Sequence, residues 1–455
     1  MNDEWFYVIV NVENKNKEGE CRMKDSYLLK TKNAEHLYFE YAKDQPIIDF
    51  HNHLSVSDVA ADRKFENLAE LWLAPDPYKH RLMRICGVEE KYITGDSAPH
   101  EKFKKYCEIF PRLVGNPVYD WSRMELSDVF GIDIPICHEN AMYIYDRVGE
   151  MLRSPEYSSN AILKRFNIEK QFPVASLTDG LAEFDGERVA PSLRGDNLLE
   201  PTKAFTEQLA IESGIAITDT ETYFAAVGVM LDRFDQKGCR FADHALDAGF
   251  FDGGADSRKA QMLVRLGTEY AKRGWTLLLH LDAKRQTSSR LANLAGPAGG
   301  YAAVGGQFDI SALCDLLNDM ERVGGLPDTV LFPLNMNDQM PLAVLQGSFS
   351  QDGVPSKVQL GPAWWWCDHA LGIENTLDSI SSFGVVSEFI GMTTDSRSIL
   401  SFVRHDYFRR LLCSWIDRRG SMMDWDAPLS VLGEIVRKIC YENVKKKTER
   451  KYEKI

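Results

Sequence analysis

The sequence has no apolar run that approaches the roughly 18 residues needed to cross a membrane as a helix. It also has no Cys-x-x-Cys pair, and its nine cysteines are odd in number and scattered over 455 residues. Scattered, unpaired cysteines are typical of reduced thiols in the cytosol. We therefore expect a cytoplasmic protein without a membrane-spanning segment.

An excess of basic residues is lacking as well. The chain has 53 Lys and Arg against 67 Asp and Glu, a formal net charge of −14. Proteins that bind a nucleic-acid backbone need a concentrated positive face, so this class is disfavoured. With 44% hydrophobic and 26% charged residues, the composition is that of an ordinary globular protein rather than a disordered or fibrous one.

A secretion signal is missing from the start of the chain. The apolar run at residues 5–10 is too short, follows acidic residues and precedes no Ala-x-Ala cleavage site. A helix-like pattern begins only at Tyr27. We therefore expect Met23 to be the better start and residues 1–22 to be a mobile extension, which N-terminal sequencing of the native protein would test.

Short apolar runs with β-branched residues recur along the chain, separated by long stretches of helical periodicity. This alternation predicts parallel strands joined by crossover helices. Eight runs indicate a closed barrel rather than an open sheet, so we expect an α/β fold of the (β/α)8 TIM type. The expected strands are residues 46–50, 172–177, 188–193, 239–242, 275–281, 329–334, 357–360 and 389–393.

Far more chain separates the first two expected strands than one crossover helix uses. The intervening residues have helical spacing interrupted by Gly and Pro, which predicts a helical subdomain inserted after strand one. The basic run after residue 444 is expected to be a solvated helix end. The expected organisation is an N-terminal extension (1–26), an N-terminal helix with barrel strand one (27–63), the helical insertion (64–165), the remaining barrel (166–425) and a C-terminal helix with a charged tail (426–455).

Polar residues follow the expected strands, at the end of the barrel where active sites of this architecture lie. His51 and His53 are two residues apart on a strand, so their imidazoles point the same way and can bind one metal ion. Such a pair alone is often a surface or core feature. Here Asp395 follows the last strand, which neighbours the first in a closed barrel. Two imidazoles and one carboxylate form the ligand set of a catalytic metal site.

Other residues at this end leave alternatives open. His280 is either a fourth metal ligand, a substrate-binding group or a histidine satisfied by its neighbours. Arg194 can bind a substrate carboxylate through two parallel hydrogen bonds, or it forms a structural ion pair with Asp196 or Glu187. The aromatic run Trp364–Trp366 is either core or a surface on which a sugar stacks.

These residues belong to longer motifs that occur in a fixed order. They include Asp49-Phe-His-Asn-His-Leu-Ser, Tyr78-Lys-His-Arg-Leu-Met-Arg, Gly274-Trp-Thr-Leu-Leu-Leu-His, Gly391-Met-Thr-Thr-Asp-Ser-Arg-Ser and Ser401-Phe-Val-Arg-His-Asp-Tyr-Phe-Arg-Arg. In this order they closely resemble the uronate isomerases of the amidohydrolase superfamily, over nearly the whole chain from about residue 27. The His-x-His pair indicates only the superfamily, whereas Thr-Asp-Ser-Arg and His-Asp-Tyr-Phe-Arg-Arg are specific.

The resemblance implies a distorted (β/α)8 barrel, one divalent metal ion, usually zinc, and a hexuronate substrate. The reactions would be D-glucuronate to D-fructuronate and D-galacturonate to D-tagaturonate, and a homo-oligomer is suggested. The implied metal ligands are His51, His53 and Asp395, and the implied catalytic residues are Asp395, Tyr78 and Arg397. The implied substrate-binding residues are Arg194, His280, Asp243, His244, Trp364 and Trp365.

Isomerisation takes a proton from C2 and delivers one to C1 through an enediol or enediolate. Asp395 and Tyr78 are both candidates for the base, and the sequence does not decide between them. Arg397, which is always cationic, can stabilise the developing oxygen charge but is a poor base.

Departures from the family cluster near the expected site. Pro77 replaces a histidine, Gly180 stands in an altered loop, and Asp282 replaces a glycine. A carboxylate from Asp282 near a cation would repel an anionic substrate or add a ligand, so we expect reduced activity that Pro77→His with Asp282→Gly improves. Two alternatives remain: a metal-dependent hydrolase of an acidic sugar derivative or lactone, and a non-catalytic family member.

Overall fold

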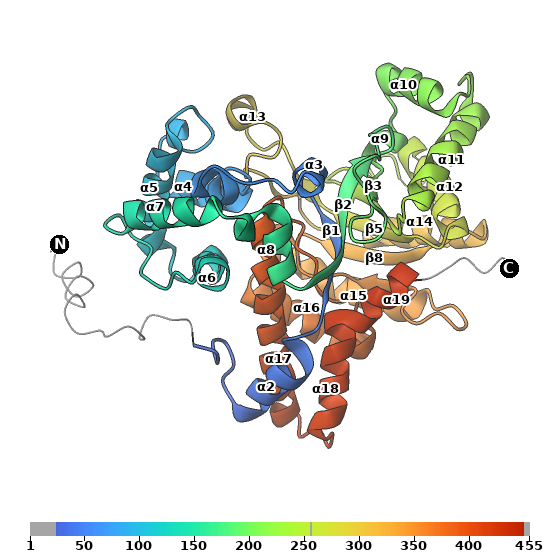
Figure 1. Cartoon of the computed structure of the whole chain (residues 1–455). Coiled ribbons are helices and arrows are strands. Elements are labelled where there is room, and N and C mark those ends of the chain that lie inside the picture. Colours follow the sequence, from blue (N-terminus) through green and yellow to red (C-terminus); the bar gives the residue numbers. More distant parts are fainter. Residues whose placement is uncertain (1–23, 255–256, 450–455) are drawn as a thin grey trace.

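The computed structural model describes residues 24–254 and 257–449 (Figure 1). The expectations for the extension at 1–22, for a start at Met23 and for the end of the charged tail lie outside the described residues. Within the described ranges, no helix is both long and apolar enough to span a membrane. The eight cysteines in these ranges are all free thiols.

A curled parallel sheet forms the centre of the molecule. Its seven strands follow the order of the chain, and each pairs in parallel with the next. Seven of the eight expected segments overlap an observed strand, which confirms the α/β class. The strands are β1 (Ile47–Asn52), β2 (Ile168–Ser176), β3 (Ser192–Arg194), β4 (Phe241–Leu246), β5 (Thr276–Leu281), β8 (Asp328–Pro333) and β9 (Val358–Leu360).

The prediction of an eighth strand at 389–393 is wrong, because this segment has no strand conformation in the structure. Gly391 has φ of 90°, and a Cβ there would lie 2.2 Å from the carbonyl oxygen of Ile439. Asp395 also has positive φ, at 47°. These two residues break the extended backbone that a strand ladder requires. The sheet is therefore a half-barrel in which an irregular segment takes the eighth position.

This irregular segment still joins β1. The Asp395 amide donates to the His51 carbonyl (3.0 Å), and the His53 amide donates to the Ser396 carbonyl (2.8 Å). The His51 amide also donates to Thr393 Oγ1 (2.9 Å). Three hydrogen bonds thus place Asp395 beside the His-x-His pair without a complete strand.

Aromatic rings from four strands fill the space enclosed by the curled sheet. Phe50 of β1 lies 5.5 Å from Phe241 of β4 and 6.4 Å from Phe332 of β8, between ring centroids. Phe172 of β2 lies 4.9 Å from Phe241. All four side chains are buried, and fully burying such a ring contributes about 2–3 kcal/mol to folding. This aromatic layer lies inside the curled sheet, and the candidate polar residues follow it at the strand ends.

Only helices and turns connect β1 and β2, and Figure 1 shows most of them on one side of the sheet, opposite the helices between residues 196 and 272. Trp72, Phe103 and Tyr106 form an aromatic centre within this insertion. Its helices and helical turns are α3 (Val56–Ala60), η2 (Ala69–Leu73), α4 (Pro77–Ile85), η3 (Glu90–Tyr92), α5 (Pro99–Ile109), η4 (Phe110–Leu113), α6 (Pro117–Met124), η5 (Glu125–Val129), α7 (Ala141–Leu152), η6 (Pro155–Tyr157) and α8 (Ser159–Arg165).

The crossover helices cover the outer face of the sheet, and a small antiparallel ribbon follows β5. The helices are α9 (Asp196–Leu199), α10 (Lys203–Ser213), α11 (Thr220–Gln236), α12 (Arg258–Lys272), α13 (Ser289–Ala295), α14 (Ile310–Arg322), α15 (Gln339–Ser348) and α16 (Ala370–Phe383), and the ribbon pairs β6 (Ala283–Lys284) with β7 (Ala303–Val304). Short 3-10 turns are η7 (Met336–Asp338), η8 (Trp365–Cys367), η9 (Val386–Glu388) and η10 (Ile399–Phe402).

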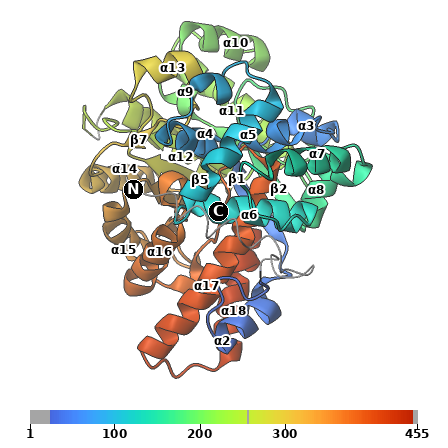
Figure 2. The same ribbon diagram turned by 90° about the vertical axis from the view of Figure 1, so that its left-hand side faces the viewer.

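Three helices from the early and late parts of the chain, α2, α17 and α18, lie together at one end of the molecule in both views (Figures 1 and 2), whereas the last element, α19, contacts β1 of the sheet. The basic run is not simply a solvated helix end, because Lys447 is buried and its Nζ lies 2.5 Å from Asp328 Oδ2. The terminal elements are α2 (Lys32–Leu37), η1 (Tyr38–Ala42), α17 (Val403–Met422), α18 (Leu429–Arg437), η11 (Lys438–Glu442) and α19 (Asn443–Glu449).

Candidate active site

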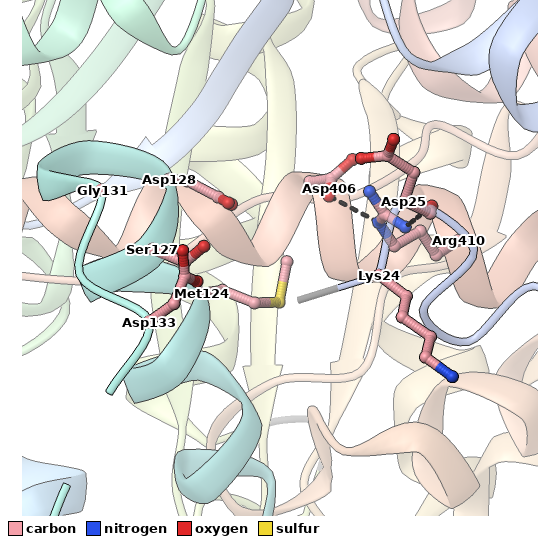
Figure 3. A pocket seen from close by; sticks show the side chains of 9 residues that line it. All are labelled: Lys24, Asp25, Met124, Ser127, Asp128, Gly131, Asp133, Asp406 and Arg410. Atoms are coloured by element: carbon pink, nitrogen blue, oxygen red, sulfur yellow. Dashed lines mark hydrogen bonds and ion pairs between the residues drawn. The ribbon is translucent and has the colours of Figure 1, made fainter. Parts of the chain in front are cut away.

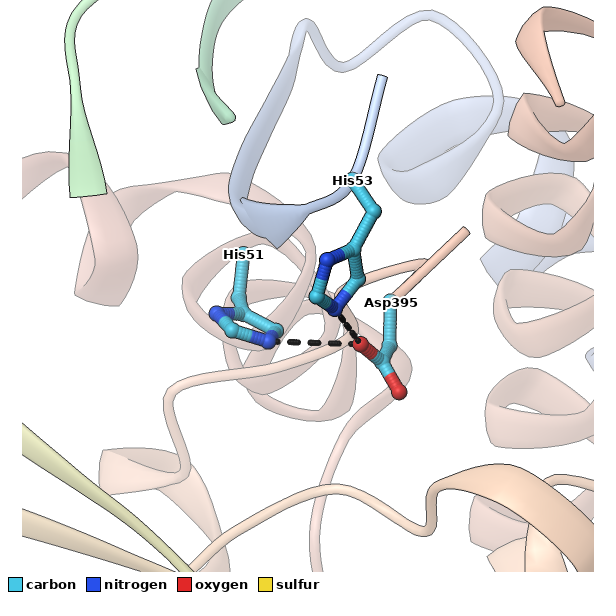
Figure 4. A group of neighbouring side chains, drawn as sticks. All are labelled: His51, His53 and Asp395. Atoms are coloured by element: carbon cyan, nitrogen blue, oxygen red, sulfur yellow. Dashed lines mark ion pairs between the residues drawn. The ribbon is translucent and has the colours of Figure 1, made fainter. Parts of the chain in front are cut away.

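His51, His53 and Asp395 converge on one point at the carboxyl-terminal end of β1 (Figure 4). The Nε2 atoms of His51 and His53 lie 3.2 Å and 3.0 Å from the same oxygen, Asp395 Oδ1. The two histidines alternate with Asn52 along an extended backbone, which puts both rings on the same side. The sequence-based expectation that these three side chains meet agrees with the structure.

The donor set fits a divalent cation. In the described part of the chain, His51 Nδ1 and Asp395 Oδ2 are buried without a hydrogen-bond partner. Burial favours the neutral form of Asp395, but hydrogen bonds from His51 and His53 outweigh it and hold the pKa of Asp395 well below its usual range. Burial also lowers the pKa of His53 to about 4, which leaves the neutral imidazole that binds metals. These three residues would hold one metal ion.

A second group shares His51. Asp243 of β4 and His280 of β5 lie with His51 within 4.8 Å, between ligand atoms. His280 Nδ1 is 2.5 Å from Asp243 Oδ1, while its Nε2 is buried and unpartnered among the described residues. A histidine whose far nitrogen is fixed by a carboxylate is the usual arrangement around metal sites. His280 is thus oriented toward the cluster, either as a further ligand or as a substrate donor.

Arg194 lies beside this group at the end of β3. Its Nη1 is 3.4 Å from Asp243 Oδ2, and its Nη2 is 3.0 Å from Asp196 Oδ2. The ion pair with Asp196 that the sequence left open is therefore present. The guanidinium also remains half-buried at the site, so it can bind an anionic substrate beside Asp243.

Asp49 binds the two threonines that precede Asp395 in the chain. Its carboxylate accepts hydrogen bonds from the Thr394 hydroxyl (2.6 Å) and the Thr394 amide (3.1 Å), and a further one from Thr393. His405 Nε2 lies 3.8 Å away. These contacts fix the segment that carries Asp395.

Tyr78 reaches this end of the sheet from α4 in the helical insertion. Pro77 occupies the first turn of α4, where a missing amide proton has no cost, and Asp76 caps the helix by accepting from the Tyr78 amide (2.9 Å). The buried Lys79 binds both Asp76 (2.6 Å) and Glu125 (3.1 Å). This buried ion network fixes the start of α4 and hence the position of Tyr78.

The hydroxyl of Tyr78 has a partner that sequence reasoning did not assign. It donates to Asp368 Oδ2 (2.9 Å), and Arg404 Nη1 donates to the same oxygen (3.2 Å). The sequence pattern indicates Asp368 in part, because it is one of the polar residues that follow the seventh expected strand. Arg404 lies in the motif that begins at Ser401, but it is on a helix 36 residues later in the chain, and nothing in the sequence paired it with Asp368.

Arg397 lies at the edge of the site. Its exposed side chain lines a cavity of about 320 Å³, together with Leu54, Arg63 and Phe65 among others. Arg63 is already paired with Asp58 (3.0 Å) and with Glu70. Leu54, which directly follows His53 in the chain, is the part of this lining nearest in sequence to the metal-binding residues.

The two tryptophans differ in exposure. Trp364 is buried, and its ring centroid lies 4.6 Å from that of His280. Trp365 is half-buried, stands 4.7 Å from Trp364 and has φ of 40°.

The structure does not bring His244 to the candidate site formed by His51, Asp243 and His280. Its Nε2 lies 2.8 Å from the hydroxyl of Tyr270 on α12, because alternate residues of β4 face opposite sides of the sheet.

Asp282 also points elsewhere. Its carboxylate accepts a hydrogen bond from the Gly306 amide (2.7 Å), and its backbone has φ of 63°. To lie on the same side of the chain as His280, two residues earlier, Asp282 would need an extended backbone, which its left-handed conformation interrupts. Asp282 therefore braces the loop after β7 rather than the metal ligands.

A larger cavity, of about 490 Å³, lies away from this chemistry (Figure 3). Its lining includes Lys24, Asp25, Asp133, Asp406 and Arg410. Arg410 is already bound to Asp406 (2.7 Å) and to the Asp25 carbonyl (2.7 Å). This cavity contains none of the grouped metal-binding side chains.

Comparison with known proteins gives a consistent result. The family model described as "Glucuronate isomerase" matches residues 20–261 and 253–447. Uronate isomerases from Bacillus licheniformis and Oceanobacillus iheyensis are 35% and 36% identical, covering 93% and 92% of this chain and 96% of each relative.

Solved structures agree with the sequence matches. The uronate isomerase of Thermotoga maritima superposes with a TM-score of 0.85 at 26% identity, covering 94% of this chain and 99% of that one. The glucuronate isomerase of Caulobacter crescentus shares the fold with a TM-score of 0.82 at 23% identity, covering 96% and 97%. With the matched residues spanning the sheet, the insertion and the site, the chain belongs to the glucuronate isomerase family.

Proposed function

We propose that this protein is a metal-dependent uronate isomerase that interconverts aldohexuronates and ketohexuronates. The observation that carries the proposal is the convergence of His51, His53 and Asp395 beside Arg194, in a chain of this family. D-Glucuronate and D-galacturonate are the substrates to test, with D-fructuronate and D-tagaturonate as products. Homo-oligomerisation and a cytoplasmic location stay predictions.

The donor set favours one divalent transition metal, and zinc is the first ion to test. Imidazole nitrogens and a carboxylate oxygen suit zinc, and three protein ligands leave positions open for substrate. When bound, such an ion supplies positive charge next to the substrate oxygens, where charge develops during isomerisation. His280 is a candidate for an additional ligand.

We assign the transfer of the proton on carbon and the transfer of the hydroxyl protons to different residues. Asp395 Oδ2 has no partner within the described residues and belongs to an ionised carboxylate, so it is the candidate base for the proton on C2. Burial raises the pKa of Tyr78 well above its usual range, so the phenol stays neutral and handles hydroxyl protons instead.

Arg194 and Arg397 are assigned to the negative charges of the substrate. Arg194 lies deepest, and we assign it to the carboxylate that distinguishes a uronate from a neutral sugar. Arg397 lies at the cavity edge and would bind substrate oxygens there. Trp364 and Trp365 would form the apolar wall that keeps water from the reacting carbons.

The test combines metal content per chain with an aldose–ketose assay on both hexuronates. Metal-replete protein should convert at least one of them, and chelation followed by metal addition should remove and restore turnover. Hexuronolactones and simple amides belong in the same screen, because turnover of those compounds without isomerisation would identify a hydrolase and refute the proposal.

A further inference from the structure

We propose that Asp368, held by Arg404, orients the hydroxyl of Tyr78 and takes up its proton during isomerisation. The inference rests on the proposed function and adds a positioning residue behind Tyr78. It assigns a role to a buried ion pair that contacts none of the grouped metal-binding side chains of the described chain.

Asp368 and Arg404 form a buried ion pair behind the Tyr78 hydroxyl. Asp368 and Arg404 are 4% and 2% exposed, so neither charge is screened by bulk water. Asp368 Oδ2 accepts from Tyr78 (2.9 Å) and from Arg404 (3.2 Å). An ionised carboxylate cannot donate, so the single hydroxyl proton of Tyr78 points at Asp368. The lone pairs of the phenol oxygen are thereby left for a substrate hydroxyl.

The Tyr78 ring is enclosed by one guanidinium and two indole rings. The Arg404 guanidinium lies over this ring, 4.6 Å from its centroid, and 4.1 Å from the centroid of Trp121. Trp121 and Trp366 meet the ring edge-to-face at 5.6 Å and 5.2 Å. A ring held on its face and edges can change the proton on its oxygen without changing its position.

The ion pair is linked to the segment that carries Asp395. Arg404 also donates to the carbonyl of Thr394 (3.4 Å), the residue before Asp395. Because the same guanidinium binds Asp368 and the Thr394 carbonyl, it fixes the position of Asp368 relative to Asp395, the candidate base. Burial raises the pKa of Asp368 to about 7, with Asp395 adding to the rise and Arg404 and Tyr78 opposing it. A carboxylate with that pKa can both accept and return a proton near neutrality.

The proton steps balance within one turnover. The base removes the C2 proton, the C2–H electron pair becomes the C1–C2 double bond of the enediolate, and the C1 carbonyl pair moves to O1. The O2–H bond breaks and its proton goes to Tyr78 Oη, while the Tyr78 proton passes to Asp368 Oδ2. Tyr78 then gives its proton to O1 as Asp368 returns its own to Tyr78. The O2–H electron pair becomes the new C2 carbonyl as the C1–C2 double-bond pair takes the proton from the base at C1. No external oxidant, reductant or proton is consumed.

The test compares Asp368→Asn with Asp368→Ala in metal-replete protein. The amide of Asn can still accept the Tyr78 hydrogen bond but cannot take the proton. We expect both variants to lose about 100-fold or more in kcat, the range of a general acid–base contribution, with KM and metal content nearly unchanged. Asp417→Asn is the matched control, because Asp417 is also buried and accepts a hydroxyl hydrogen bond, from Thr31 (2.6 Å), far from the site.

A double-mutant cycle with Tyr78→Phe separates this role from a structural one. If Asp368 acts through Tyr78, Asp368→Asn should cause little further loss in the Tyr78→Phe background. Multiplicative losses, or an Asp368→Asn variant within threefold of the parent kcat, would overturn the proposal. If Asp368→Ala does not fold, the Asn variant alone completes the cycle. A parent without isomerase activity would instead refute the proposed function.

Discussion

Asp395 and Asp368 are the same residue type, and both are buried near the same end of the sheet, yet their surroundings give them opposite properties. Asp395 accepts from two imidazoles and has a pKa well below its usual range, because these hydrogen bonds outweigh burial. Asp368 accepts from one phenol and one guanidinium, and burial raises its pKa to about 7. Burial alone therefore does not decide what a carboxylate does.

The difference follows from the elements that supply the donors. The donors to Asp395 come from a single strand end, His51 and His53, and they can also bind a cation. The donors to Asp368 come from two helices, α4 and α17, and they cannot. One carboxylate is suited to hold positive charge, and the other is suited to exchange a proton.

The largest contrast is expected in metal content. Asp395→Asn should lose bound divalent metal and isomerase activity together, because one of three ligands disappears. Asp368→Asn should retain the metal stoichiometry of the parent. Elemental analysis of both dialysed variants checks this, and equal metal loss in the two would remove the distinction between the carboxylates.

Tyr78→Phe tests the Asp368 side. Removing the hydroxyl should lower kcat by about 100- to 1,000-fold, since general acid–base groups contribute on this scale, while metal content stays constant. Steady-state kinetics on glucuronate and galacturonate measure the effect. Tyr223→Phe is the control, since its buried hydroxyl donates to the Leu198 carbonyl (3.0 Å) outside the site. Similar losses in both variants would indicate a packing effect.

A third buried carboxylate, Asp243, lies beside Arg194. The substitution Arg194→Met removes this cationic neighbour. We expect kcat/KM on uronates to fall by about 30-fold or more, since removing one partner of a buried charge pair costs at least about 2 kcal/mol. Arg188→Met, on the exposed approach to β3, should behave like the parent. Unchanged kinetics for Arg194→Met would exclude it from substrate binding.

The pH dependence distinguishes the two aspartates directly. Asp368 accepts a proton only when ionised, so kcat should fall toward tenfold per pH unit below about 7. Asp395 stays ionised throughout this range because its pKa is depressed. Residual activity of Asp368→Asn should lack this acidic limb. If Asp368→Asn shows the same fall in kcat below about pH 7, the fall is due to the titration of another residue.

The smallest effect is expected at the positions that depart from the family. Asp282 binds the Gly306 amide (2.7 Å), and Pro77 lies in the first turn of α4, whereas the side-chain hydrogen bonds of the contrasted carboxylates come from other residues. Pro77→His with Asp282→Gly should change kcat/KM by no more than about threefold. A large gain would show that the structure understates their influence on the site.

The sequence was sufficient for the features that depend on local pattern. Continuous apolar runs such as Trp275–Leu281 identified buried parallel strands, because strands covered on both faces need no polar alternation. The two-residue spacing of His51 and His53 implied a shared direction, because side chains alternate along a strand. The polar residues after each run marked the functional end of the sheet.

Tertiary structure decided what depends on residues far apart in the chain. Positive φ at Gly391 and Asp395 replaced the eighth strand with an irregular segment, and the same conformation at Asp282 turned its carboxylate away. Asp368 meets Tyr78 across 290 residues, and Arg404 arrives from another helix. No periodicity encodes such contacts, because a carboxylate's partners are set by packing between elements rather than by its neighbours in sequence.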